Sequence, residues 1–176
     1  MTGDESDDLA RRIRAGSGEA LEELYRSAGA RLYALAWRLT LNRADAEDAV
    51  HDLFVGLPRA LERYRERGRF EAWLRRLLVR TALMRRRGEG RRAARDAAYA
   101  GEAGRGASGP VTGDAGEAEK LLAALPEAFR AVVVLRELEG MSHAEIARAL
   151  GISEVTSRVR LVRGLEQLRR KLEREE

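Results

Sequence analysis

The chain of 176 residues has room for one ordinary domain or two small ones. Charged residues make up 35% of it and hydrophobic residues 44%, as in a globular protein with a heavily charged surface. It contains no cysteine, which excludes disulfides and thiolate zinc sites and favours a reducing compartment. With no apolar run of roughly 18 residues and no signal peptide before the acidic start, we expect a cytoplasmic protein without membrane insertion.

The formal net charge is only +4, but the charges are segregated along the chain. The first eight residues include four acids, whereas residues 85–95 include six arginines and one glutamate. Arginine favours bidentate contacts with phosphate or carboxylate. This asymmetry indicates a polyanionic partner, or an acidic cover within the molecule.

The apolar periodicity of the first half predicts helices throughout. After an acidic tail over residues 1–6, we expect a short helix over 7–15 and a longer one with apolar positions from 21 to 39. Asp45 is the expected N-cap of a third helix. Since proline lacks an N–H group, Pro58 predicts a break or kink, followed by a short segment ending near Tyr64. A fourth helix should end at residue 87, with Phe70 and Trp73 on its apolar stripe.

Residues 88–116 are rich in Gly, Ala and Arg and too poor in large apolar side chains to fold, so they predict a flexible linker. The fold class is therefore all-α, with two small helical domains over residues 7–87 and 117–174. The second domain should begin with a helix over 117–125, and Pro126 should open the next one at its first position.

The stretch from residue 140 to 170 predicts a helix-turn-helix or a simple helical hairpin. Ser142 and Glu145 have the spacing of a capping box. Gly151 should end the first helix, and Ser153 should cap a second helix that runs through Leu172. The second helix has an excess of cations, which favours DNA binding: Arg158, Arg160, Arg163, Arg169, Arg170, Lys171 and Arg174.

Three motifs in this order resemble those of bacterial extracytoplasmic-function (ECF) sigma factors. "ADAEDAVHDLF" (44–54) is similar to the family's acidic core-binding motif. "RFEAWLRRLLVRTALMRRR" (69–87) is similar to the helix that melts and reads the promoter −10 element. "LAALPEAFRAVVVLRELEGMSHAEIARALGIS" (122–153) is similar to the start of sigma region 4. Residues 7–87 thus resemble sigma region 2, and residues 117–174 resemble region 4.

The resemblance implies a sigma factor that binds RNA polymerase core and directs promoter-specific initiation. The acidic helix would bind the clamp of the β′ subunit through Asp45, Glu47, Asp48, His51 and Asp52, and region 4 would meet the β flap. The −10 element would be engaged by Tyr64, Arg69, Arg76, Arg80 and Met84. The −35 duplex would be read by Thr156, Arg158, Arg160, Val162 and Arg163.

Five positions depart from the family pattern. His51 stands where Gln is common, and little loss is expected because both side chains can form hydrogen bonds. Arg80 and Met84 stand where Asn and Asp are common, which puts the −10 specificity in question. Ser157 replaces an apolar residue and should loosen packing slightly. Val162 replaces a histidine or aromatic residue and argues for a different −35 sequence.

The implied partners are RNA polymerase core, promoter DNA and an anti-sigma factor, with no cofactor. Two distant histidines offer too few ligands for a metal site, and no catalytic motif indicates an enzyme. Two alternatives remain: a sigma-like protein that opens promoters poorly, and a DNA-binding regulator that acts without polymerase. The all-helical first half argues against the regulator, which would carry a domain of alternating strands and helices.

Overall fold

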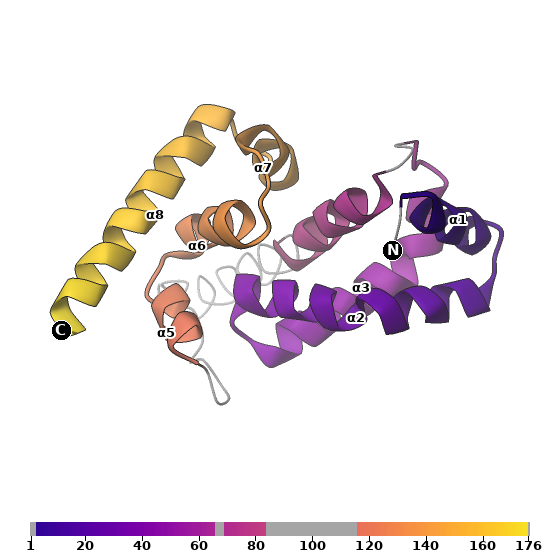
Figure 1. The fold of residues 1–176 in the computed structure, drawn as a ribbon, viewed down its shortest axis with the longest axis horizontal. Coiled ribbons are helices and arrows are strands. Elements are labelled where there is room, and N and C mark those ends of the chain that lie inside the picture. Colours follow the sequence, from indigo (N-terminus) through magenta and orange to yellow (C-terminus); the bar gives the residue numbers. More distant parts are fainter. Residues whose placement is uncertain (1–2, 66–68, 84–115, 176) are drawn as a thin grey trace, which may run out of the picture.

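The computed structural model describes residues 3–65, 69–83 and 116–175, and every regular element in these ranges is a helix (Figure 1). The first half contains α1 (Gly3–Arg14), α2 (Gly18–Thr40) and α3 (Arg43–Leu61), followed by a helix whose described part covers residues 70–83. The second half contains α5 (Glu117–Ala123), α6 (Glu127–Val133), a π-helical turn η1 (Val134–Leu138), α7 (His143–Leu150) and α8 (Glu154–Glu175). The all-α expectation is confirmed. None of these helices is long and apolar enough to cross a membrane.

The start of α3 differs from the prediction, because Asn42 and not Asp45 is its N-cap. The Asn42 side chain accepts a hydrogen bond from the Asp45 N–H at 3.1 Å. An asparagine oxygen satisfies a free N–H of the first turn as well as an aspartate oxygen does. The helix therefore begins two residues before Asp45, which instead lies in the first turn.

Of the break or kink predicted at Pro58, the break is wrong, since α3 continues through the proline to Leu61. A proline inside a helix removes one hydrogen bond and costs about 3 kcal/mol. Leu57 and Leu61 are both buried on either side of it, and their burial offsets that cost.

The first helix also differs: α1 begins at Gly3, within the predicted tail, with Ser6 buried.

The second half follows its local signals closely. Pro126 is the N-cap of α6, one position before the predicted one. Gly140 and Gly151 adopt positive φ angles of 65° and 66°, the left-handed conformation that glycine permits at a helix end. The predicted linker, except for residue 116, lies outside the described residues, as does Met84.

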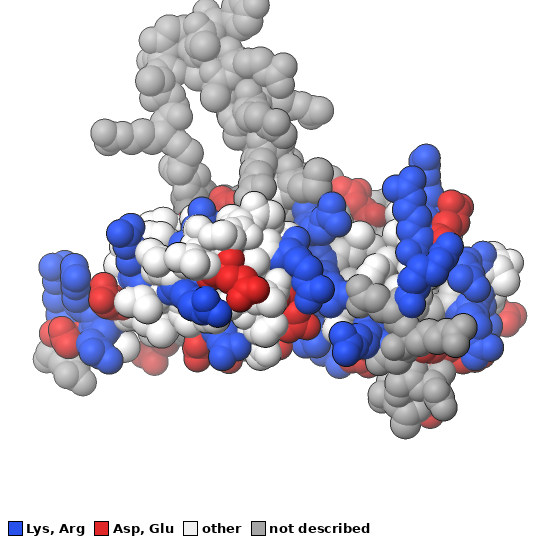
Figure 2. All heavy atoms as spheres, turned by 90° about the horizontal axis from the view of Figure 1, so that it is seen from above, with Lys and Arg blue, Asp and Glu red and all other residues white. Residues whose placement is uncertain are grey.

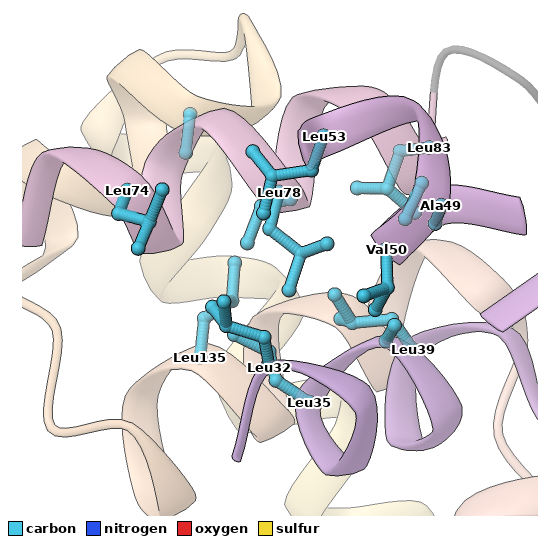
Figure 3. Close-up of a cluster of buried hydrophobic side chains, with 14 of the residues drawn as sticks. Leu32, Leu35, Leu39, Ala49, Val50, Leu53, Leu74, Leu78, Leu83 and Leu135 are labelled. Carbon is cyan, nitrogen blue, oxygen red and sulfur yellow. The ribbon is translucent and has the colours of Figure 1, made fainter. Parts of the chain in front are cut away.

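A single cluster of buried apolar side chains extends through both halves. Figure 3 shows Leu32 and Leu35 of α2 and Leu78 of the helix over 70–83 gathered in one close-up with Leu135 of η1. Leu32, Leu35, Leu78 and Leu135 are each at most 2% exposed. The two halves are therefore packed together through a shared core.

Arg130 joins the two halves by polar contacts. This α6 residue has no exposed surface, and its Nε donates to the carbonyl of Leu39, in the last turn of α2, at 3.2 Å. One terminal nitrogen donates to the carbonyl of Leu125 at 3.3 Å. A cation at a helix C-terminus is favourable, because the last carbonyls lack partners within the helix and carry partial negative charge.

Candidate nucleic-acid and polymerase interfaces

The helix-turn-helix is held by the predicted capping box at the start of α7. The Ser142 Oγ accepts from the Glu145 N–H at 3.3 Å, and the Glu145 carboxylate accepts from the Ser142 N–H at 2.9 Å. The Ser142 hydroxyl also donates to the same carboxylate at 2.8 Å, and the bonds that the Ser142 N–H and hydroxyl donate lower the pKa of Glu145, with a further contribution from Arg76 and Arg148. At the turn, the Thr156 N–H donates to Ser153 Oγ at 3.0 Å. The predicted helix ends at Ser142, Gly151 and Ser153 are thus confirmed.

A polar contact inside the motif links its two helices. Ser157 on α8 is completely buried, and its Oγ lies 2.9 Å from His143 Nδ1 on α7. Desolvation, followed by Arg136 and Arg158, lowers the pKa of His143, so the neutral imidazole can accept a hydrogen bond from the Ser157 hydroxyl. The expected loosening by Ser157 is therefore countered by a hydrogen bond to the partner helix.

The outward face of α8 is formed by three valines as well as by cations. Val155, Val159 and Val162 are 65%, 44% and 54% exposed. Arg158 and Arg163 are exposed beside them, while Thr156 and Arg160 are half-buried. Val162 was predicted to face DNA; Val155 and Val159 were missed, because an apolar residue at helical spacing usually indicates core.

Basic side chains continue along α8 to its end. Arg169, Arg170 and Arg174 are exposed there. Figure 2 shows a blue group at the left edge of the molecule, where the C-terminal end of α8 lies, and a second group on the right over the first half. The surface of both halves thus offers cations to a polyanion.

The predicted acidic residues share the solvent-facing side of α3. Glu47, His51 and Asp52 are exposed, and Asp45 and Asp48 are half-buried. Glu47 pairs with Arg43 at 2.8 Å. Sequence reasoning missed Val55, which is 67% exposed on the same helix; its position in an otherwise apolar segment gave no signal.

The predicted −10 residues are in different environments. Arg69 and Arg80 are exposed. The Arg76 side chain is only 16% exposed and lies 4.0 Å from Glu145 of α7. The neighbouring Arg75 lies 3.5 Å from Glu139. Two arginines of this helix therefore face acids of the second half.

Tyr64 is not the exposed aromatic that the sequence suggested. Its ring is half-buried and packs edge-on to Phe70, with centroids 5.7 Å apart, and its hydroxyl donates to Asp7 at 3.2 Å. Trp73 lies 4.9 Å from the same ring. Phe70 is buried and Trp73 packs against the core, as their place on the apolar stripe predicted.

A surface hollow of about 800 Å³ lies beside Tyr64, between α1 and the end of α3. It combines cations with acids and one aromatic edge, which suits a ligand with both charge and hydrogen-bonding groups. Its polar lining consists of Asp7, Arg11, Arg14, Glu62, Tyr64 and Arg65.

Two family models match the chain. Sigma-70 region 2 matches residues 24–92, and the region 4 model matches residues 115–168. The ECF sigma-E factor of Escherichia coli K12 is 31% identical over 73% of this chain and 74% of its own length. The chain belongs to the ECF group of sigma-70 factors. Neither model describes an enzyme, and among the described residues no group of three potential metal ligands occurs.

Similar proteins support this assignment along most of the chain. The ECF sigma factor SigE of Mycolicibacterium smegmatis is 36% identical over 154 residues, 84% of this chain, and the chain spans 60% of that relative's length. The sigma factor CarQ of Myxococcus xanthus is 32% identical over 90% of this chain and 92% of its own length. The sigma factor RpoE of Bartonella quintana, solved in complex with the anti-sigma factor NepR, shares the fold with a TM-score of 0.66 and 21% identity, over 89% of this chain and 98% of that one.

Proposed function

We propose that this sigma factor directs RNA polymerase to promoters by reading the −35 duplex with α8, engaging the melted −10 strand with the helix over 70–83, and binding polymerase core through α3. The observation that carries the proposal is the outward face of α8. This face belongs to the second helix of a helix-turn-helix and includes exposed arginines, and the contacts of α8 with the rest of the motif fix its position.

The dimensions and charge of α8 suit duplex DNA. The major groove is about 12 Å wide and admits one α-helix. Thr156, Arg158, Arg160, Val162 and Arg163 lie on its first three turns, where a recognition helix contacts base edges. Exposed guanidinium groups further along can neutralise phosphates, which position the helix without reading sequence.

The acidic face of α3 suits a basic surface of the polymerase. Asp45, Glu47, Asp48, His51 and Asp52 would meet the β′ clamp, while the second half would contact the β flap. Complementary charges across such an interface supply steering and register more than affinity. The apolar Val55 beside them would add burial at the centre of the contact.

For the −10 strand, the exposed Arg69 and Arg80 can follow the phosphates, and the hollow beside Tyr64 can receive a base taken out of the stack. Arg76 lies against Glu145, so DNA contact by Arg76 requires the second half to move away. The packing of the two halves against each other also suits regulation, because it keeps Arg76 away from DNA. We infer that an anti-sigma factor stabilises this inactive arrangement, since RpoE was solved in complex with a partner of this class.

The test is transcription by purified RNA polymerase core reconstituted with this chain on a fragmented GC-rich library, with transcript starts sequenced. Starts sharing a −35 and −10 pair are expected. Asp48→Lys with Asp52→Lys should abolish them, whereas Glu19→Lys with Glu22→Lys, the same charge change on exposed residues of α2, should not.

The alternatives give different results. Core binding without starts would support the sigma-like protein that opens promoters poorly. Specific duplex binding with no core binding would support a regulator that acts without polymerase, and would refute the role of α3.

A further inference from the structure

The outward face of α8 is apolar at its centre. At 3.6 residues per turn, Val155, Val159 and Val162 fall within about 60° of the helix circumference. On the opposite side, Ser157 and Gly164 are buried. A surface helix usually carries polar residues on the side away from its core, so this valine strip needs a different explanation from packing within the chain.

The valine strip is bordered by cations on both sides. On the helical wheel Arg158 lies on one flank of the strip and Arg163 on the other, and both are exposed. Arg158 also contacts Glu154 at 3.2 Å, one turn earlier on the same helix. The occupant of this face must therefore offer an apolar group at its centre and negative charge along both edges.

The major groove of DNA has this pattern. Phosphates line its two edges, and thymine alone among the four bases presents a methyl group, at C5, to the groove floor. An aliphatic side chain packed on that methyl removes both from water. A protein partner could cover the valines, but it would also have to supply acids on both sides of them.

We propose that Val155, Val159 and Val162 read thymine C5-methyl groups in the −35 element, so that the chain prefers A·T pairs at the positions facing them. The inference rests on the proposed function, which it deepens by naming the base contacted. It also assigns a role to two residues outside the predicted recognition set.

The test removes the methyl group and nothing else. Holoenzyme made with the full chain is bound to a selected promoter in which each −35 thymine is replaced, one at a time, by deoxyuridine. One buried methyl is worth about 0.8 kcal/mol, so replacement at a contacted position should weaken binding about fourfold. At one −35 position, Val159→Ala should weaken binding to the promoter with thymine and leave binding to the promoter with deoxyuridine unchanged. Val155→Ala and Val162→Ala should show the same difference at other positions.

These substitutions are safe for folding, because the three valines are exposed and alanine is the better helix former. Leu172→Ala, on the same helix and 49% exposed, is the matched control and should leave every thymine-to-deoxyuridine ratio unchanged. Deoxyuridine in the spacer should likewise have no effect.

Two results would overturn the inference while the proposed function stands: normal promoter binding with no deoxyuridine effect at any position, or effects that all three alanine variants retain. The valine strip would then belong to a protein partner. Failure of the wild-type holoenzyme to bind any promoter would refute the proposed function, and the inference with it.

Discussion

Arg130→Met should destabilise the whole chain, because it removes the hydrogen bonds by which Arg130 links the two halves. Methionine fills much of the same volume but leaves the carbonyls of Leu39 and Leu125 without their donors. A hydrogen bond from a charged donor is worth about 1.5–3 kcal/mol. Relief of guanidinium desolvation offsets part of the loss of two such bonds, so we expect the free energy of unfolding to fall by about 2–4 kcal/mol.

Urea unfolding of the full chain, followed by circular dichroism, measures this loss. Arg148→Met is the control, since Arg148 is exposed and its Nε donates to a carbonyl of its own helix, and it should change the free energy by less than about 0.5 kcal/mol. Because the chain has no cysteine, spin labels can be placed at Glu22→Cys and Glu166→Cys, both exposed. Arg130→Met should broaden the distance distribution between them. Equal unfolding free energies and equally narrow distributions would refute the role of Arg130.

Three further predictions concern local features. Ser142→Ala removes the capping box and should cost about 1 kcal/mol, measured by urea unfolding; an unchanged midpoint would contradict the cap's contribution. Gly56→Ala should stabilise the chain by up to about 1 kcal/mol, because its new Cβ meets nothing within 4 Å, whereas Gly164→Ala should destabilise it, because its Cβ would lie 2.8 Å from a Val133 methyl carbon; melting temperatures that shift in the same direction would refute this contrast. The folded state lowers the pKa of His143 below 6.5, so folding favours the neutral imidazole. The stability that depends on the neutral form is complete above pH 6.5 and is lost as the pH falls from 6.5 through the lowered pKa. Urea midpoints at pH 7.5 and 5.5 should therefore differ less in His143→Gln, and an equal difference would exclude His143 as the titrating group.

The sequence predicted the features that depend on neighbouring residues. The capping box of Ser142 and Glu145 and the chain reversals at Gly140 and Gly151 each follow from a few adjacent side chains. The continuation of α3 through Pro58 was not predictable in this way, because burial on both sides of the proline outweighs its local preference.

Contacts between distant residues left no signal in the sequence. Arg130 is a basic residue in a short helix, and its partner carbonyl lies 91 positions earlier in the chain. Val155 and Val159 have the spacing of core residues, and only the packing of α8 shows that they face outward. The roles of the acidic residues of α3 remain predictions that the transcription assay would test.

The bond from Arg130 to α2 ends on a backbone carbonyl, so it depends on where that helix stops and not on which side chain stands at position 39. Substitutions of Leu39 keep the acceptor in place. Inserting or deleting one residue within α2 would rotate its final turn by about 100° and shift it by about 1.5 Å, and would move the acceptor away from the guanidinium. Chimeras in which α2 is replaced by the corresponding helix of a related sigma factor should therefore preserve this hydrogen bond when the helix length is conserved, however far the residues diverge.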